Sequence, residues 1–308
     1  MRKIFYTVFS ISQICFLLLY PQEALAASKE GMQLWLNVLL PVLLPFLILT
    51  GILIHTNMAG KLLQPVEVIW NKVLGVSAAG AYAVIVGALC GYPVGAKITS
   101  DLYENHQISE SEAKYLLTFT NHASPVFVRT YLCHICLKDQ IPARTVFGIF
   151  ALSDLTIMLR FVVYRNKIQF LSADKKKKTP VSSSSGAFLD VSIMNGFETV
   201  TRLGGYILMF SILSACISHF WNMKNLIGYT LSGILELTTG LCRLQNANIH
   251  MQWKYLLTLF LTAFGGICIT FQTRSLVTRK LSMLPYITAK LLNGITTVLF
   301  ALFFSKII

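Results

Sequence analysis

The chain has 308 residues, of which 55% are hydrophobic and only 13% are charged. Soluble domains carry about 25% charged residues, so the composition argues against a soluble enzyme, a secreted disulfide scaffold and a disordered protein. The net charge of +13 does not indicate nucleic acid as a partner, because no Lys/Arg stripe is interleaved with aromatic residues. Membrane proteins instead concentrate Lys and Arg in short cytoplasmic loops. We therefore predict an all-α, polytopic protein of the cell membrane, surrounded by the lipid bilayer.

The N-terminal 27 residues have the layout of a secretory signal peptide. Two basic residues precede an apolar run at 4–20, and the small residues Ala24-Leu25-Ala26-Ala27 follow. This order is typical of a signal peptide, and an uncleaved first transmembrane helix is the alternative. Either interpretation of residues 1–27 places residue 30 on the extracytoplasmic side.

Eight further apolar segments follow, each close to the ~20 residues that cross a bilayer core as helix. They cover roughly 34–55, 74–97, 114–136, 144–164, 197–219, 226–244, 254–273 and 284–305. If every segment spanned the membrane, the loop 165–190 with its run of four lysines would lie outside. This arrangement conflicts with the positive-inside rule. One of the first four segments is therefore predicted to enter and leave by the same face.

The segment 32–57 is the first candidate for such a re-entrant hairpin. Pro41 and Pro45 lie in its middle, and each removes a backbone donor. The segment 195–219, with Gly204-Gly205 at its centre, is the candidate for a second hairpin. With the first hairpin the basic loop 165–190 becomes cytoplasmic, and with the second the basic cluster Arg274, Arg279 and Lys280 does too. An ordinary proline-kinked helix at 32–57 is the alternative.

A short internal repeat indicates two related halves. The sequence Lys114-Tyr115-Leu116-Leu117-Thr118 recurs 140 residues later at 254–258. An apolar helix with an interruption precedes each copy, at 87–97 and 233–243, and a candidate hairpin precedes each of those helices. An odd number of crossings between the halves predicts that the second is inverted. Inverted repeats with interrupted helices are typical of secondary transporters, whose substrate site lies at the midplane.

These patterns divide the chain into two gate-like repeats and their connections. The predicted domains are repeat 1 at 28–143, a linking transmembrane helix at 144–164, a cytoplasmic basic and Ser-rich linker at 165–190, repeat 2 at 191–275 and a C-terminal transmembrane helix at 276–308.

Two interrupted motifs are candidates for the substrate site. Gly91-Tyr92-Pro93-Val94-Gly95 cannot continue as a regular helix, and Asn121-His122-Ala123-Ser124-Pro125 interrupts the third helix about four turns in. Unwinding inside a membrane frees backbone groups that must find partners, and a ligand or ion is one such partner. Helix kinks relieved by neighbouring side chains are the alternative.

Charged residues inside the apolar segments are further candidates, because a charge in the bilayer is costly. Glu236 lies beside Thr238 and Thr239 at an expected break, where it could take up H⁺ or coordinate Na⁺, and pairing with a structural arginine is the alternative. Arg129 could clamp a carboxylate or snorkel to the interface. The predicted substrate-binding residues are Gly91, Tyr92, Pro93, Gly95, Lys97, Asn121, His122, Ser124, Arg129, Thr238 and Thr239, with Glu236 as the ion-coupling residue. Other intramembrane charges are Asp154, Arg160, Glu198, Arg202 and Lys290.

No motif points to an enzyme, a metal or a cofactor. The sequence has no G-x-x-x-x-G-K-[ST], G-x-S-x-G or H-E-x-x-H pattern and no nucleophile–base constellation. The single C-x-x-C at Cys133–Cys136 is interpreted as two buried small hydrophobes, with redox or metal chemistry as the alternative.

The motifs at 91–97, 120–127 and 235–240 resemble the sporulation integral membrane proteins of endospore-forming bacteria, which carry a nucleoside-recognition (gate) domain. The resemblance covers about residues 34–270. It implies a fold similar to the transport core of concentrative nucleoside transporters. It also implies a role in spore formation, moving dipicolinate, a small dianion, across the mother-cell or outer forespore membrane. The scaffold helices of nucleoside transporters are missing, so either contacts within a homo-oligomer replace them or the mechanism differs.

We therefore predict a secondary-type transporter for a small polar, anionic solute. The alternative is a non-transporting membrane scaffold or regulator of spore envelope assembly.

Overall fold

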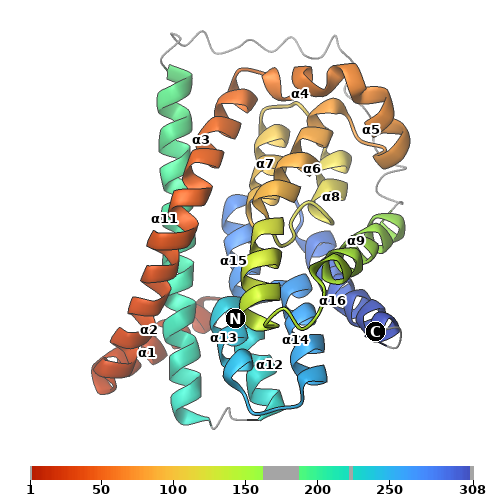
Figure 1. The fold of residues 1–308 in the computed structure, drawn as a ribbon. Coiled ribbons are helices and arrows are strands. Elements are labelled where there is room, and N and C mark those ends of the chain that lie inside the picture. The colour runs from red at the N-terminus through yellow and green to blue at the C-terminus, as the bar shows by residue number, and fades with distance from the viewer. Residues whose placement is uncertain (1, 162–186, 222–224, 306–308) are drawn as a thin grey trace.

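The computed structural model describes residues 2–161, 187–221 and 225–305, and every regular element in these ranges is a helix (Figure 1). Three helical stretches are long and apolar enough to cross a membrane: Phe188–Phe220, Met251–Leu276 and Leu284–Phe304. The number rises to 5 if each of two bent helix pairs forms one span. The prediction of an all-α, polytopic membrane protein is confirmed. Most of the predicted linker at 165–190 lies outside the described residues.

The first half begins with a long helix that includes both prolines. α1 (Arg2–Leu19) and α2 (Pro21–Leu34) meet at 113°. α2 then continues through a π-helical turn, η1 (Trp35–Leu39), into α3 (Leu40–His55). The predicted hairpin at 32–57 is therefore wrong, because the helix continues past both prolines. The π turn ends two residues before Pro41, and such a turn is one of the ways in which a continuous helix accommodates a proline, which has no N–H to donate.

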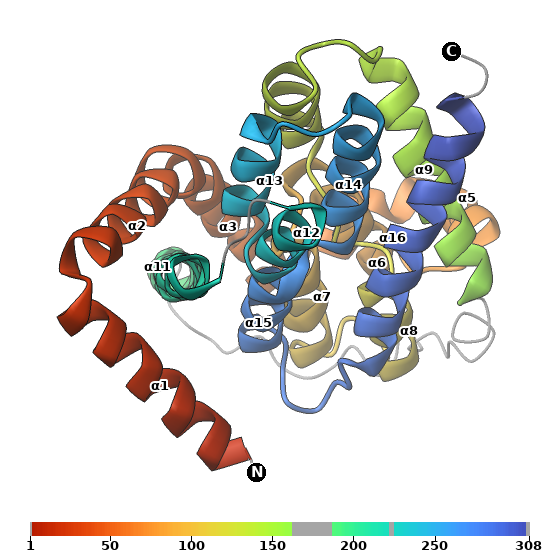
Figure 2. The ribbon, with the colours of Figure 1, turned by 90° about the horizontal axis from the view of Figure 1, so that it is seen from below.

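The second predicted hairpin, at 195–219, is also wrong, because α11 (Ala187–Phe220) is one unbroken helix. Gly204 serves close packing there. A Cβ at Gly204 would lie 2.6 Å from the ring of Trp35, whose Nε1 donates to the carbonyl oxygen of Val200 at 2.9 Å. Gly31 faces Ser211 and Gly51 faces Ser192, so α2–α3 and α11 run antiparallel side by side (Figures 1 and 2). Small residues at membrane helix interfaces allow this close approach.

Short helices lead from the long helix to the first re-entrant hairpin. α4 (Met58–Leu63), η2 (Gln64–Val66) and α5 (Glu67–Leu74) lie across the upper end in Figure 1, bent by 91° from α3. The chain then turns into α6 (Ala78–Cys90) and α7 (Val94–Glu104). A Cβ at Gly87 would lie 3.2 Å from the Cα of Gly95, so α7 folds back along α6. We call this pair hairpin 1.

The second hairpin has the same construction at the opposite end of the molecule. α12 (Leu226–Leu235) and α13 (Leu237–Asn246) reverse at Glu236. A Cβ at Gly240 would lie 2.1 Å from the Cα of Gly233, so these helices also pack back to back. Hairpin 1 occupies the upper half of Figure 1 and this second pair, hairpin 2, the lower half. The re-entrant hairpins thus lie at the two positions where the sequence predicts broken helices.

A broken helix and a closing helix follow each hairpin. In the first half these are α8 (Glu110–Leu117), an unwound segment at 118–124, the π-helical η3 (Phe127–Cys136) and α9 (Ala143–Arg160). In the second half they are α14 (Met251–Phe264), a break at Gly265, α15 (Gly266–Leu276) and α16 (Leu284–Ser305). α8 lies in the upper half of Figure 1, whereas α14 lies in the lower half. The same order of elements therefore occurs twice with opposite direction.

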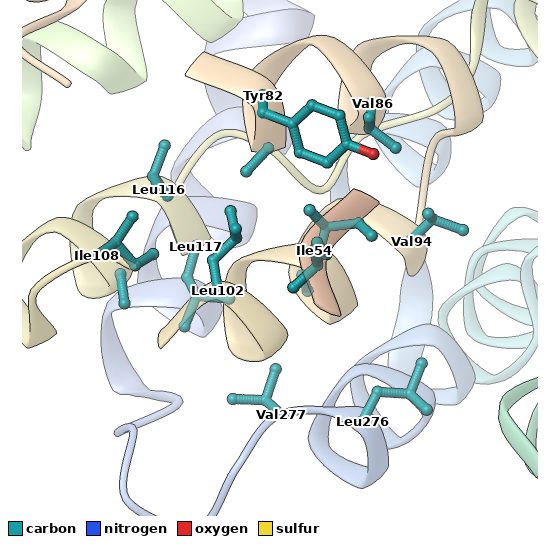
Figure 3. Packing of buried hydrophobic residues seen from close by; sticks show 14 of the residues in the cluster. Ile54, Tyr82, Val86, Val94, Leu102, Ile108, Leu116, Leu117, Leu276 and Val277 are labelled. Atoms are coloured by element: carbon teal, nitrogen blue, oxygen red, sulfur yellow. The ribbon is translucent and has the colours of Figure 1, made fainter. Parts of the chain in front are cut away.

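Each hairpin has its own hydrophobic core. Figure 3 shows side chains of the core around hairpin 1, where Ile54 from α3 meets Leu102 from α7, Leu117 from α8 and Leu276 from α15. The other core joins α13 and α14 to η3 and α9. Because the core of hairpin 1 includes the end of α15, the two halves are packed together.

Candidate functional site

The tip of hairpin 1 is fastened to the unwound segment of the first broken helix. The backbone N–H of Tyr92 donates to the carbonyl oxygen of His122 at 2.7 Å. Gly91 has a φ of +78°, and a Cβ there would lie 2.6 Å from the backbone nitrogen of Ser124. A Cβ at Gly95 would lie only 1.9 Å from the carbonyl oxygen of Thr120. The glycines of the first motif therefore allow the hairpin to press against unwound backbone.

Asn121 connects this unwound segment to the second half. It is buried, and its Nδ2 donates to the hydroxyls of Thr273 on α15 and Tyr286 on α16, each at 3.1 Å. The side-chain oxygen Oδ1 of Asn121 and the hydroxyl of Tyr92 are both buried and have no hydrogen-bond partner in the described ranges. Buried polar atoms are almost always paired, so two unpaired ones near a hairpin tip are typical of a binding site.

A buried lysine lies beside these groups. Lys290, on α16, is 2% exposed, and its Nζ donates to the carbonyl oxygen of Asn121 at 3.1 Å. Nζ also lies 5.8 Å from the centre of the Tyr92 ring, within range of a cation–π interaction. No described carboxylate lies within salt-bridge distance of Lys290. Burying a charge near the bilayer centre costs at least about 2.5–3.5 kcal/mol on insertion scales.

Lys290 is recognised in the sequence as an intramembrane charge, but the motifs do not place it in the site. It belongs to the C-terminal helix, outside both predicted repeats, and no local motif surrounds it. Tyr286, one turn earlier on α16, was missed for the same reason. The signal that could have found both is the spacing of the two polar residues on one face of an apolar helix.

The tip of hairpin 2 is built around Glu236, which is 4% exposed and forms the N-cap of α13. Its carboxylate accepts from the backbone N–H groups of Thr238 at 3.1 Å and Thr239 at 2.6 Å. The hydroxyl of Thr238 donates to the same carboxylate at 2.8 Å. The carboxylate therefore lies at the positive end of a half-helix. No described arginine lies within salt-bridge distance of it, so the structural ion pair considered as the alternative is absent there.

Aromatic side chains connect the tip of hairpin 1 to the tip of hairpin 2. The ring of Tyr92 lies 6.4 Å from the ring of Phe127, which stacks on Tyr131 at 5.1 Å between ring centres. Tyr131, on η3, donates its hydroxyl to the carbonyl oxygen of Thr238 at 3.2 Å. Tyr92, Asn121 and Lys290 are therefore in contact at hairpin 1, and the aromatic chain leads from them to hairpin 2.

Of the remaining predicted residues, His122 and Ser124 lie in the unwound segment and Pro93 forms the tip of hairpin 1. The Nδ1 of His122 lies 3.2 Å from the carbonyl oxygen of Ala123, and Ser124 accepts from the backbone N–H of Phe127 at 3.2 Å. Both contacts are local, so these side chains stabilise the irregular backbone.

Lys97 lies further along α7 and forms an ion pair with Asp101 at 2.5 Å. Both residues line a cavity of about 490 Å³ between α7, α11 and the segment after α15. Charged side chains dominate its walls, including Glu198, Arg202, Arg279 and Lys280. The backbone N–H of Lys97 donates to the carbonyl oxygen of Pro93 at 3.2 Å, but none of the other predicted site residues lines this cavity.

Arg129 is also placed elsewhere. Its side chain is 57% exposed and pairs with Asp139 at 2.8 Å, in the turn that follows η3. His134 contacts the same carboxylate at 2.6 Å. Hydrogen bonds from His134 and then Arg129 lower the pKa of Asp139 below its usual value. Arg129 therefore belongs to an exposed charge cluster, and its predicted clamp is not formed at the hairpin tips.

Metal-ligating residues do not gather in the described ranges. Within 2–161, 187–221 and 225–305, no three His, Cys, Asp or Glu side chains lie together in a way that could hold a metal ion. Cys133 and Cys136 are buried, free thiols.

The fold and the site define a multi-pass membrane protein whose two inverted halves each contribute a re-entrant hairpin. The chain is similar to the sporulation integral membrane protein YlbJ of Bacillus subtilis (strain 168), with 25% identity over an alignment of 326 residues. The match covers 93% of this chain and 79% of that protein. No protein-family model matches the chain, and no solved structure matches it. The chain is therefore a membrane protein related to a sporulation integral membrane protein.

Proposed function

We propose that the chain is a secondary-type transporter for a small anionic solute, similar to dipicolinate, in spore formation. The observation that carries the proposal is a pair of hairpins, from opposite ends, each packed against the interruption of the helix that follows it, Gly95 against Thr120 and Gly233 against Gly266. Irregular backbone at this depth is tolerated only where protein or a polar cavity surrounds it. Secondary transporters use such broken elements to bind solute at the midplane and then rock one half against the other.

The polar groups at the tips support a binding role over a purely structural one. α7 and α13 each begin at a hairpin tip, so each N-terminal end carries partial positive charge there. The unpaired hydroxyl of Tyr92 and the unpaired amide oxygen of Asn121 lie at the tip of hairpin 1. These groups are available to a solute that enters between the halves.

Glu236 is the proposed coupling residue. Its carboxylate accepts the first N–H groups of α13, so protonation would remove a charge that stabilises the start of this half-helix. A proton or another cation at Glu236 would thereby change the position of the hairpin 2 tip. This provides a route from an ion gradient to the movement of one half.

The test is flux through vesicles that contain only the purified chain. Uptake of labelled dipicolinate and of a labelled nucleoside is measured for the wild type, Glu236→Gln and Gly205→Ala. Gly205 has open space around it, so its alanine variant is the matched control. We expect saturable dipicolinate flux that Gly205→Ala retains and Glu236→Gln reduces. A wild type that moves neither solute would refute transport and favour a scaffold.

A further inference from the structure

We infer that Lys290, Tyr92 and Asn121 form the subsite that holds the carboxylate of the transported solute. The inference rests on the proposed transport function and gives it a charge-selecting residue from the C-terminal helix. The solute class is a small dicarboxylic acid.

Lys290 has fewer partners than a buried ammonium group requires. Such a group has three N–H donors, and in the described residues Nζ has one hydrogen bond, to the carbonyl oxygen of Asn121, besides its contact with the Tyr92 ring. Its side chain is 2% exposed, so it does not reach an aqueous surface. Buried charges are normally paired. Asp154, on the neighbouring helix α9, forms no salt bridge with Lys290 and accepts instead from the Nδ2 of Asn293 at 2.9 Å.

The two unpaired polar atoms, the Tyr92 hydroxyl and the Asn121 amide oxygen, complete the proposed subsite. The hydroxyl of Tyr92 can donate to a carboxylate, as can the free N–H groups of Lys290. The amide oxygen of Asn121 accepts, and it requires a donor such as a second, protonated carboxyl group. A cation, a neutral donor and an acceptor therefore lie at one hairpin tip. This combination fits a dicarboxylic acid better than a neutral nucleoside, which would leave the lysine charge unpaired.

The position of the subsite also suits alternating access. Asn121 is on the broken helix of the first half, whereas Lys290 is on the closing helix of the second half. The hydrogen bond between them joins Nζ to a backbone carbonyl of unwound chain. A solute carboxylate that accepts from Lys290 in place of the Asn121 carbonyl oxygen would contact both halves at once. The affinity for the solute would therefore depend on how the two halves are positioned.

Equilibrium binding tests the inference apart from transport. The full chain is purified into nanodiscs, and binding of labelled dipicolinate is measured by equilibrium dialysis. We expect Lys290→Met to weaken binding by about tenfold or more, because a hydrogen-bonded charge pair is lost. Tyr92→Phe should weaken it by about threefold to tenfold through the loss of one neutral donor. Lys290→Arg should retain part of the affinity.

The control is Lys114→Met, which removes a lysine that pairs with Glu110 at 2.6 Å on α8, away from the tips. It should bind as the wild type does. Unchanged affinity in both Lys290→Met and Tyr92→Phe would overturn the subsite, and Tyr92→Phe alone decides if Lys290→Met does not fold. A wild type that transports a nucleoside but binds no dicarboxylic acid would overturn the subsite and leave a transporter. A wild type that transports nothing would refute the proposed function itself.

Discussion

Replacing Gly95 by alanine should loosen hairpin 1 from the unwound segment on which it rests. The new Cβ would lie 1.9 Å from the carbonyl oxygen of Thr120, whereas ordinary contact begins near 3.4 Å. The hairpin must therefore move by about 1.5 Å, because backbone cannot turn aside as a flexible side chain can. Overpacking of this kind typically costs about 1–3 kcal/mol. It outweighs the gain of up to about 1 kcal/mol that alanine brings to a helix interior.

Thermal unfolding of the purified protein measures this effect, and dipicolinate binding measures the displacement of the tip. Gly205→Ala is the matched control, because the same change in α11 meets nothing within 4 Å. We expect Gly205→Ala to be neutral or slightly stabilising and Gly95→Ala to lower both stability and binding. Equal stability of the two variants would refute the close packing on which the hairpin assignment depends.

Three further predictions concern the hairpin cap, the exposed charge cluster and the sidedness of the fold. Glu236→Ala removes the cap of α13 and should cost about 0.5–2 kcal/mol in thermal unfolding; an unchanged midpoint would contradict the capping role. Because the pKa of Asp139 is lowered in the folded state, its stabilising effect is present above the ordinary pKa of 3.8 and is lost as the pH falls through the lowered value. The difference in unfolding midpoint between the wild type and Asp139→Asn should therefore vanish only in strong acid, and a constant difference at all pH values would contradict this. Single cysteines at His106 and His250, in a background without native cysteines, should react with an impermeant thiol reagent from opposite sides of the membrane; reaction from one side would refute the inversion.

The interruptions of the helices could be predicted because their causes are local. Pro93 lacks a backbone donor, and Gly91 has a positive φ that other residues rarely adopt. Pro125 likewise predicts unwound chain just ahead of it, and the structure has no helix at 118–124. Ser109 is a residue type that favours the N-cap position, and its hydroxyl accepts from the N–H of Glu112 at 3.2 Å.

The direction of the chain after an interruption could not be predicted from local causes. A chain that breaks at Pro93 can continue across the membrane or fold back, and the choice depends on whether the two helices can pack together. Pairs of glycines on either side of each break decide it here, Gly87 with Gly95 and Gly233 with Gly240. Such pairs are visible in the sequence and are a usable signal for a re-entrant hairpin.

The glycines of α11 led to a predicted break where the structure has a continuous helix. Gly204-Gly205 was interpreted as a break, but a glycine in a membrane helix is also the residue that admits a bulky partner. Trp35 fills the space beside Gly204, and its indole bonds to backbone one turn away. Only knowledge of the partner helix separates these two roles. The site residues on α16 were missed for a related reason, since Lys290 meets Asn121 through the tertiary fold alone.

The sidedness of the protein does not depend on the misplaced hairpins. The positive-inside rule requires that one of the first four apolar segments return to its own side, and it places no condition on which one. The predicted hairpin at 32–57 is replaced in the structure by hairpin 1, and the predicted hairpin at 195–219 is replaced by hairpin 2. Each half therefore still contains one hairpin that returns to its own side, as the positive-inside argument requires. With residue 30 outside, we expect the end of α15 and the basic residues Arg279 and Lys280 after it on the cytoplasmic side. Hairpin 1 would then open from the cytoplasm and hairpin 2 from the opposite side, as alternating access requires.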